Sequence, residues 1–96
     1  AEFGRCLVLD CHSFPSTPLP YEEAGPDSPR PDICVGTDAF HTTPAVSEAF
    51  ESACRSQGWS VCRDDPFAGA LVPASCYQKD RRVQAVMVEI NRKLYL

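Results

Sequence analysis

The most apolar segment of the chain contains a carboxylate. Residues 83–91 read VQAVMVEIN, and apolar side chains in both alternating sets predict a strand that is buried on both faces and central in its sheet. Because strand side chains alternate between faces, Glu89 extends the apolar row of Val83, Ala85 and Met87. An ionised carboxylate in such a row must be paired, bound to a cation, or protonated with a raised pKa.

Glu89 therefore has two interpretations. A carboxyl group whose pKa is raised by burial can act as a general acid or base near neutral pH, which makes Glu89 a candidate catalytic residue. Alternatively, Glu89 forms an ion pair with Arg92 at the end of the strand. Replacing Glu89 by Ala leaves folding largely intact under the first interpretation, but costs roughly 3 to 5 kcal/mol under the second.

The remaining patterns predict an α/β fold. Strand-forming runs occur at residues 6–10, 33–36 and 59–63, the first being a short buried strand that ends in an acid. Helical periodicity over residues 44–57 predicts a crossover helix between the second and third of these strands. We expect a mixed, largely parallel sheet of about four strands with one crossover helix, in a single domain over residues 1–96.

The predicted helix has clear signals at both ends. Thr43 can cap its N-terminus, Pro44 suits the first helical position, and Gly58 can end it in a left-handed conformation. The spacing predicts one core-facing stripe, formed by Val46, Ala49, Phe50, Ala53, Cys54 and Gln57.

Two long loops complete the chain. Residues 13–32 contain six prolines, which favours either a functional lid or a surface excursion, and residues 64–82 are rich in turn formers.

Polar residues follow the first predicted strand. Asp10, Cys11 and His12 come at its carboxyl end, where open α/β sheets place their ligand crevices. Asp10 could orient the imidazole of His12 as a second-sphere acceptor, although a hydrogen-bonded structural histidine is the alternative. Cys11 and His12 are neighbours on an extended segment and point to opposite sides, so we expect no thiol–imidazole pair.

Composition argues against several classes of protein. Six cysteines in 96 residues would suggest disulfides in a secreted protein, but the regular strand and helix patterns favour free thiols, most of them in apolar runs. The formal net charge of -4 and the scattered basic residues argue against a nucleic-acid partner. No apolar run approaches the roughly 18 to 20 residues of a membrane span, so we expect a soluble, cytoplasmic protein without a membrane partner.

Several blocks, taken in order, resemble a known enzyme family. LDCHSFP, RPDICVGT, GWSV, DPFAGALVP and VEINRKLYL are similar to the carboxyl-terminal half of the N-formylglutamate amidohydrolase family, among the zinc-carboxypeptidase-like hydrolases. The D-x-H-S and E-I-N-R-x-L-Y blocks are the most specific. The resemblance implies part of a zinc-carboxypeptidase-like fold and zinc-dependent hydrolysis of the amide bond of a small N-acyl amino acid.

The resemblance also implies roles for single residues. His12 matches the third zinc ligand of the family, with Asp10 as its second-sphere partner, and Glu89 matches the glutamate that activates a zinc-bound water. Arg92 matches a family arginine that either meets the substrate or steadies Glu89. The positions implied to line the substrate pocket are Arg92, Pro66, Phe67 and Gly69.

The implied metal site is incomplete. The other two zinc ligands of the family, a histidine and a glutamate, come from an earlier segment, and residues 1–5 do not supply them. His41 lacks an acidic partner at the needed spacing, so we do not expect it to bind metal. We therefore expect residues 1–96 to be the C-terminal portion of a larger domain, inactive alone, with Zn²⁺ only if another segment completes the site. The alternative is a non-catalytic α/β domain that binds a partner, or that forms a homodimer by pairing with a second copy through an exposed sheet edge.

Overall fold

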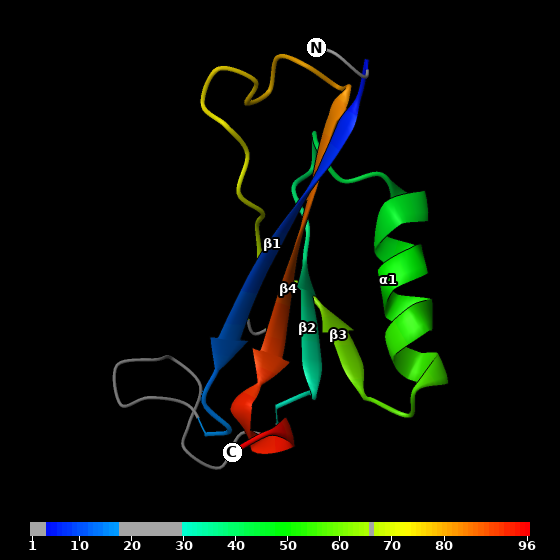
Figure 1. Ribbon diagram of the computed structural model, residues 1–96, viewed down its shortest axis with the longest axis vertical. Helices are drawn as coiled ribbons and strands as arrows, with labels where there is room; N and C mark the ends of the chain where they lie inside the picture. The colour runs from blue at the N-terminus through cyan, green and yellow to red at the C-terminus, as the bar shows by residue number, and fades with distance from the viewer. Residues whose placement is uncertain (1–3, 18–29, 66) are drawn as a thin grey trace.

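The computed structural model describes residues 4–17, 30–65 and 67–96. These residues form one sheet with a single α-helix packed on one face (Figure 1). In chain order the elements are β1 (Cys6–Phe14), β2 (Ile33–Gly36), α1 (Pro44–Ser56), β3 (Val61–Arg63), β4 (Val83–Asn91) and the short 3₁₀ helix η1 (Arg92–Leu94).

The last strand lies inside the sheet, whose order is β1-β4-β2-β3. β4 pairs parallel with β1 and antiparallel with β2, and β2 pairs parallel with β3. Helix α1 connects the two parallel strands β2 and β3, as a crossover helix does. The mixed, largely parallel sheet and the central position of β4 are confirmed.

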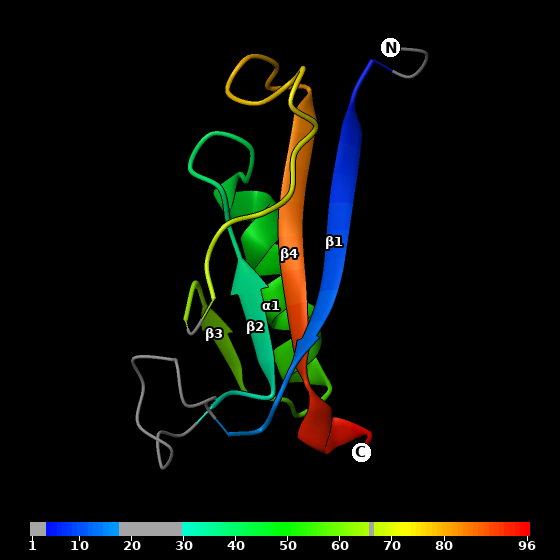
Figure 2. The ribbon, with the colours of Figure 1, turned by 90° about the vertical axis from the view of Figure 1, so that its left-hand side faces the viewer.

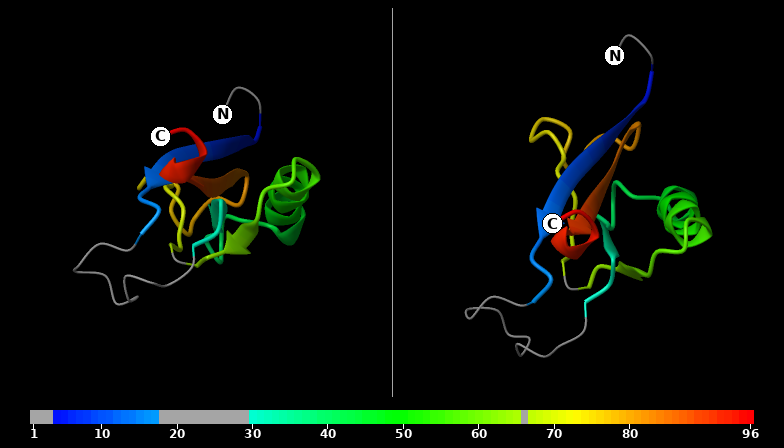
Figure 3. Two further views of the ribbon diagram at one scale, coloured as in Figure 1. Left: turned by 90° about the horizontal axis from the view of Figure 1, so that it is seen from below. Right: turned by 60° about the horizontal axis from the view of Figure 1, so that its bottom comes forward.

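The two faces of the sheet are covered differently. Helix α1 packs on the face formed by Ile33, Val35 and Val86, which are the buried residues of the main apolar cluster. The segment between β3 and β4 crosses the opposite face, as Figures 1 and 2 show together. Figure 3 shows that α1 lies over the β2 and β3 side of the sheet and leaves β1 away from it.

β1 differs from its prediction in length and in burial. The strand continues to Phe14 instead of ending at residue 10, so Asp10 and His12 lie within it. Among the described strands β1 pairs with β4 alone, and its apolar residues Leu7 and Leu9 are 47% and 49% exposed. The apolar run that suggested a buried strand therefore belongs to an exposed sheet edge.

Helix α1 begins and ends close to the predicted positions. The Thr43 side chain accepts a hydrogen bond from the Val46 N–H at the N-terminus. At the other end Gly58 has a φ of +86°, and the Trp59 N–H donates to the Cys54 carbonyl. This left-handed ending is the Schellman motif, for which glycine is the preferred residue.

The buried stripe of α1 is rotated from the predicted one. Ser47 and Glu51 are its buried residues, whereas Ala49, Ala53 and Gln57 of the predicted stripe are exposed. The cause lies on β3, where Arg63 donates from Nε and Nη2 to the two oxygens of Glu51 at 2.6 and 3.1 Å. This bidentate pair allows a carboxylate to face the sheet, which apolar periodicity does not anticipate.

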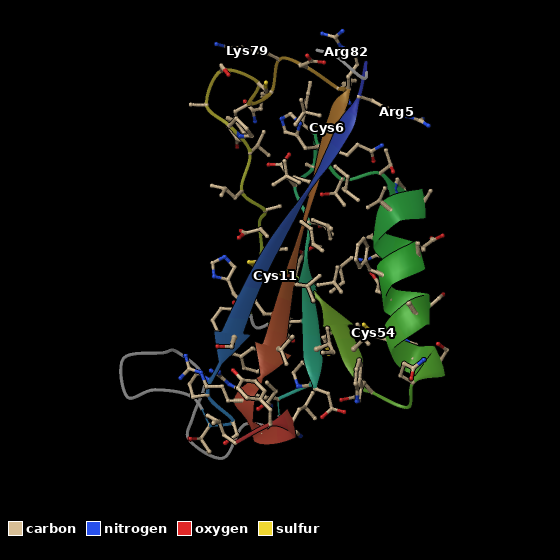
Figure 4. All side chains as sticks on the ribbon, viewed as in Figure 1. Arg5, Cys6, Cys11, Cys54, Lys79 and Arg82 are labelled. Carbon is tan, nitrogen blue, oxygen red and sulfur yellow. The ribbon has the colours of Figure 1, made fainter. Side chains whose placement is uncertain are left out.

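The cysteines of this chain are free thiols. All six cysteines are free, and they are dispersed, with Cys6 and Cys11 on β1 and Cys54 on α1 (Figure 4). Cys34 is buried, but Cys6 is exposed because it lies on the edge strand, contrary to the expectation for an apolar run.

Within the described part of the chain, no helix is long and apolar enough to cross a bilayer.

Candidate functional site

Three chemically active side chains lie in one row across the sheet. In the strand register, Glu89 of β4 is opposite His12 of β1 on one side and opposite Cys34 of β2 on the other. Residues in register on neighbouring strands project to the same face, and for this row it is the face away from α1. The sheet therefore brings His12 and Glu89 to the same face, as a shared site requires.

The imidazole of His12 is held by a carboxylate. Its Nε2 lies 2.7 Å from Oδ1 of Asp10, which is two residues earlier on the same strand and therefore on the same face. The His12 side chain is 50% exposed, so it borders solvent while Asp10 fixes the orientation of its ring. With Nε2 in contact with Asp10, Nδ1 is the ring nitrogen that can take a metal.

Glu89 is the buried member of the row, with 8% of its surface exposed. Burial raises the pKa of its carboxyl above the usual value. The nearby charge of His12 lowers this pKa, that of Asp10 raises it, and those of Arg30 and Arg92 lower it. In the described part of the chain no ion pair involves Glu89, so the pair with Arg92 that the sequence allowed is not formed there. The raised pKa of the Glu89 carboxyl is therefore caused mainly by desolvation.

Arg92 lies near the carboxyl end of β1, on the face of the sheet opposite His12 and Glu89. Its Nε donates to the hydroxyl of Ser13 at 3.2 Å, and Ser13 projects to the face opposite His12 because the two are neighbours on the strand. Arg92 also borders an open hollow of about 370 Å³, lined by Pro15, Ser16, Arg92, Lys93 and Leu96. Its charge reaches Glu89, but its hydrogen bond holds it away from the row.

Arg30, which no sequence pattern indicated as a site residue, lies on the face of Glu89. Its guanidinium carbon is 5.5 Å from the ring centroid of Phe14 and 5.5 Å from that of Phe67, and Nη1 donates to the carbonyl of Pro15 at 3.2 Å. Phe14 is buried and projects to the same face as His12. The only sequence signal for Arg30 was its place in the RPDICVGT block, directly before β2.

The loop implied to line the pocket is pinned to this face. The carbonyl of Phe67 accepts a hydrogen bond from Sγ of Cys34 at 3.1 Å, and burial raises the pKa of that thiol. Gly69 has a φ of +90°, and its carbonyl approaches Gly36 so closely that a Cβ at Gly36 would meet it. Phe67 and Gly69 therefore lie over the row, whereas Pro66 is outside the described residues.

His41 has a structural role. It is 1% exposed, and its Nε2 accepts from the backbone N–H of Gln78 at 2.8 Å. A backbone N–H can only donate, so the ring proton is on Nδ1, which lies 2.7 Å from the carbonyl of Val83. Both ring nitrogens of His41 therefore hold backbone groups, one at Val83 at the start of β4 and one at Gln78 in the segment before it.

The fit to a metal is limited to one ligand. His12 suits a metal ligand, because it is partly exposed and its ring is oriented by a carboxylate. Residues 4–17, 30–65 and 67–96 contain no group of three or more histidine, cysteine, aspartate or glutamate side chains that could hold an ion. One imidazole alone does not retain zinc, so the described residues form at most a part of a metal site.

The two histidines should respond differently to removal. We expect His41→Ala to lower the free energy of unfolding by about 2 to 4 kcal/mol, because it leaves buried backbone groups unpaired and a cavity. His12→Ala is the matched control, with an expected change of about 0.5 kcal/mol or less at an exposed position. Urea denaturation of both variants measures this, and equal losses would contradict the assigned roles.

Comparison with known proteins gives a consistent result. The profile of the N-formylglutamate amidohydrolase family matches residues 1–96. Among solved structures, the N-formylglutamate amidohydrolase from Ralstonia eutropha JMP134 is similar, with a TM-score of 0.79 and 26% sequence identity. The alignment covers 99% of this chain and 35% of that one, so the chain spans about a third of that protein. No curated protein matches this chain.

Proposed function

This chain belongs to the N-formylglutamate amidohydrolase family, and from that premise we propose that it is part of a hydrolase that cleaves the amide bond of an N-acyl amino acid such as N-formylglutamate. The observation that supports this most directly is the register of His12 opposite Glu89, on one face of the sheet. Because the chain spans 35% of its structural relative, the activity is proposed for the complete gene product that contains residues 1–96.

Glu89 is proposed as the general base and general acid. Its raised pKa favours proton exchange closer to neutral pH than an exposed glutamate allows. It would take a proton from the attacking water and return it to the nitrogen of the leaving amine. Cys34 and the pinned Phe67 backbone close one side of Glu89, which limits the access of bulk water to the carboxyl.

His12 is proposed as a ligand of Zn²⁺ through Nδ1, with Asp10 holding the ring by Nε2. When bound, Zn²⁺ supplies a Lewis acid that polarises the amide carbonyl and lowers the pKa of water to about 7. The remaining ligands would come from outside the described residues, as a family of longer chains allows. Phe67 and Gly69, and Pro66 outside the described residues, are proposed to border the substrate.

The activity test uses Glu89→Gln. We expect release of formate from N-formyl-L-glutamate by the complete gene product to fall about 10²- to 10⁴-fold, because the amide cannot exchange the proton. Glu48→Gln, on the exposed surface of α1, is the matched control and should keep its rate. If the wild-type protein hydrolyses no N-acyl amino acid, or if Glu89→Gln keeps its rate, the proposal is wrong.

The same substitution should change stability with a defined pH dependence. Because the pKa of Glu89 is raised in the folded state, the folded protein binds this proton more tightly than the unfolded chain does. The resulting stabilisation is fully present below the unfolded pKa of about 4.3 and is lost as the pH rises through the folded pKa. We therefore expect Glu89→Gln to melt at a higher temperature than wild type at pH 7 and to lose this advantage at pH 4. Thermal unfolding at both pH values measures the difference, and a destabilised variant at pH 7 would instead indicate an ion-paired Glu89.

A second candidate function, self-association, is favoured by the open edge at β1. Leu7 and Leu9 are exposed on a strand that pairs on one side only in the described sheet, and such edges pair readily with other strands. Under this function the 96-residue chain is a dimer in light scattering, and Leu9→Lys returns it to a monomer. A monomeric wild-type chain over a wide concentration range would exclude this role.

A further inference from the structure

Two of the otherwise dispersed cysteines lie opposite each other on neighbouring strands. Cys34 of β2 is in register with Cys62 of β3, and the two strands are parallel. Both side chains project to the face away from α1, because the residues that flank them, Ile33, Val35 and Val61, pack on the α1 side. The fold thus places two free thiols side by side on the face that carries the candidate site.

The spacing of these strands suits a disulfide bond that is easily reduced. Neighbouring strands lie about 4.7 to 4.9 Å apart, within the range of roughly 4.4 to 6.8 Å between the Cα atoms of a disulfide. Because strand side chains stand roughly perpendicular to the sheet, the Cβ atoms have nearly the same spacing as the strands. This spacing is just above the usual disulfide limit of about 4.5 Å, so a bond here carries strain, which makes it more reducible. The geometry therefore favours a reversible bond over a permanent one.

The register of the pair is fixed on both sides of it. Before the pair, the backbone N–H of Ile33 donates to the carbonyl of Ser60 at 3.0 Å. After the pair, the backbone N–H of Asp64 donates to the carbonyl of Val35 at 2.9 Å, and the Asp64 carboxylate accepts from the backbone N–H of Thr37 at 2.7 Å. Neither strand can slide past the other without breaking these contacts, so the two thiols stay opposite each other.

The two thiols differ in their access to an oxidant. Cys34 is fully buried, its Sγ donates to the carbonyl of Phe67 at 3.1 Å, and burial raises the pKa of this thiol. Cys62 is half-buried on β3, which pairs with β2 alone among the described strands. The thiolate is the reactive form of cysteine. A small oxidant therefore meets Cys62 first, and Cys34 is placed to react second.

We propose that Cys34 and Cys62 form a reversible disulfide on reaction with a peroxide, and that this bond releases the loop at Phe67 from the sheet. Cys62 attacks hydrogen peroxide, the O–O bond breaks, and the products are a sulfenic acid on Cys62 and one water, which takes up the thiol proton. Cys34 then attacks the Cys62 sulfur, so that the S–S bond forms and the S–O bond breaks. The proton of Cys34 leaves with the hydroxyl group as a second water. The two thiols lose two electrons, and one peroxide is reduced to two waters.

Oxidation removes a contact that holds the loop over the candidate site. A sulfur in a disulfide carries no hydrogen, so Cys34 no longer donates to the carbonyl of Phe67. Cys34 is also the residue opposite Glu89 on β2. The redox state of the pair therefore changes how firmly the loop is held on the face of His12 and Glu89.

Peptide mapping tests the bond in the complete gene product. The reduced protein is treated with hydrogen peroxide, its remaining thiols are alkylated, and a digest is examined by mass spectrometry. We expect two peptides joined through Cys34 and Cys62, lacking two hydrogens and separated by dithiothreitol. Cys6→Ser, on the exposed edge strand β1, is the matched control and should form the bond as wild type does. Wild-type protein without the joined peptides, or with Cys62 oxidised only to a sulfinic acid, would overturn the proposal.

Hydrogen–deuterium exchange tests the release of the loop. We expect backbone amides of residues 67–72 to exchange about 2- to 5-fold faster in the oxidised protein, because one weak S–H donor is lost. Dithiothreitol should restore the slower exchange, and the amides of α1 serve as the internal reference. Cys62→Ser, treated with the same oxidant, should show no change at residues 67–72. A disulfide that leaves this exchange unchanged would reject the release of the loop.

Neither experiment requires hydrolysis of an N-acyl amino acid. A protein that forms the disulfide but releases no formate would contradict the proposed hydrolase and keep the redox site, and an active hydrolase without the disulfide would do the reverse. Circular dichroism establishes that Cys62→Ser is folded, and Cys62→Ala replaces it if the hydroxyl disturbs the half-buried position. The peptide map of the wild type needs no variant.

Discussion

The insertion of β4 between β1 and β2 is the constraint on which the site depends. Because β4 is paired on both sides, Glu89 has a neighbouring strand on each flank, with His12 in register on one and Cys34 on the other. A carboxyl group so enclosed loses hydration, which raises its pKa, and nearby charges adjust it without forming an ion pair among the described residues. The other features of this face are the loop held at Phe67 by Cys34 and the Arg30 guanidinium, which lies 5.5 Å from the ring centroids of Phe14 and Phe67.

Much of the fold could be predicted because its strongest signals are local. β4 was bounded correctly since both of its faces are buried and its apolar pattern is continuous. The ends of α1 were also readable, because Thr43 and Gly58 act on backbone groups within one turn of the helix. By contrast, β1 continues through Asp10 and His12 only because β4 supplies backbone partners for it, and a strand from the other end of the chain leaves no trace in the local pattern.

The candidate site likewise contains residues that the sequence predicted and residues whose positions depend on distant partners. Alternation along β4 was enough to predict a buried Glu89, and family resemblance pointed to His12. The rotation of α1 toward Glu51 was not predictable, since it depends on Arg63 of another strand. Nor was Arg30, which follows a proline-rich segment and takes its position from Phe14 and Phe67, neither of which is near it in sequence. Pairings between distant residues are what periodicity and capping rules cannot supply.

The order of the strands also determines when the two halves of the site can meet. β2, α1 and β3 are consecutive and can assemble early, whereas β1 must wait for β4, which comes after all three in the described part of the chain. Closing so long a stretch of chain is slow compared with local pairing. The imidazole and the carboxyl are therefore brought together only in a late folding event, after translation has passed β4. A nascent chain that ends before β4 has the imidazole of His12 without the carboxyl of Glu89.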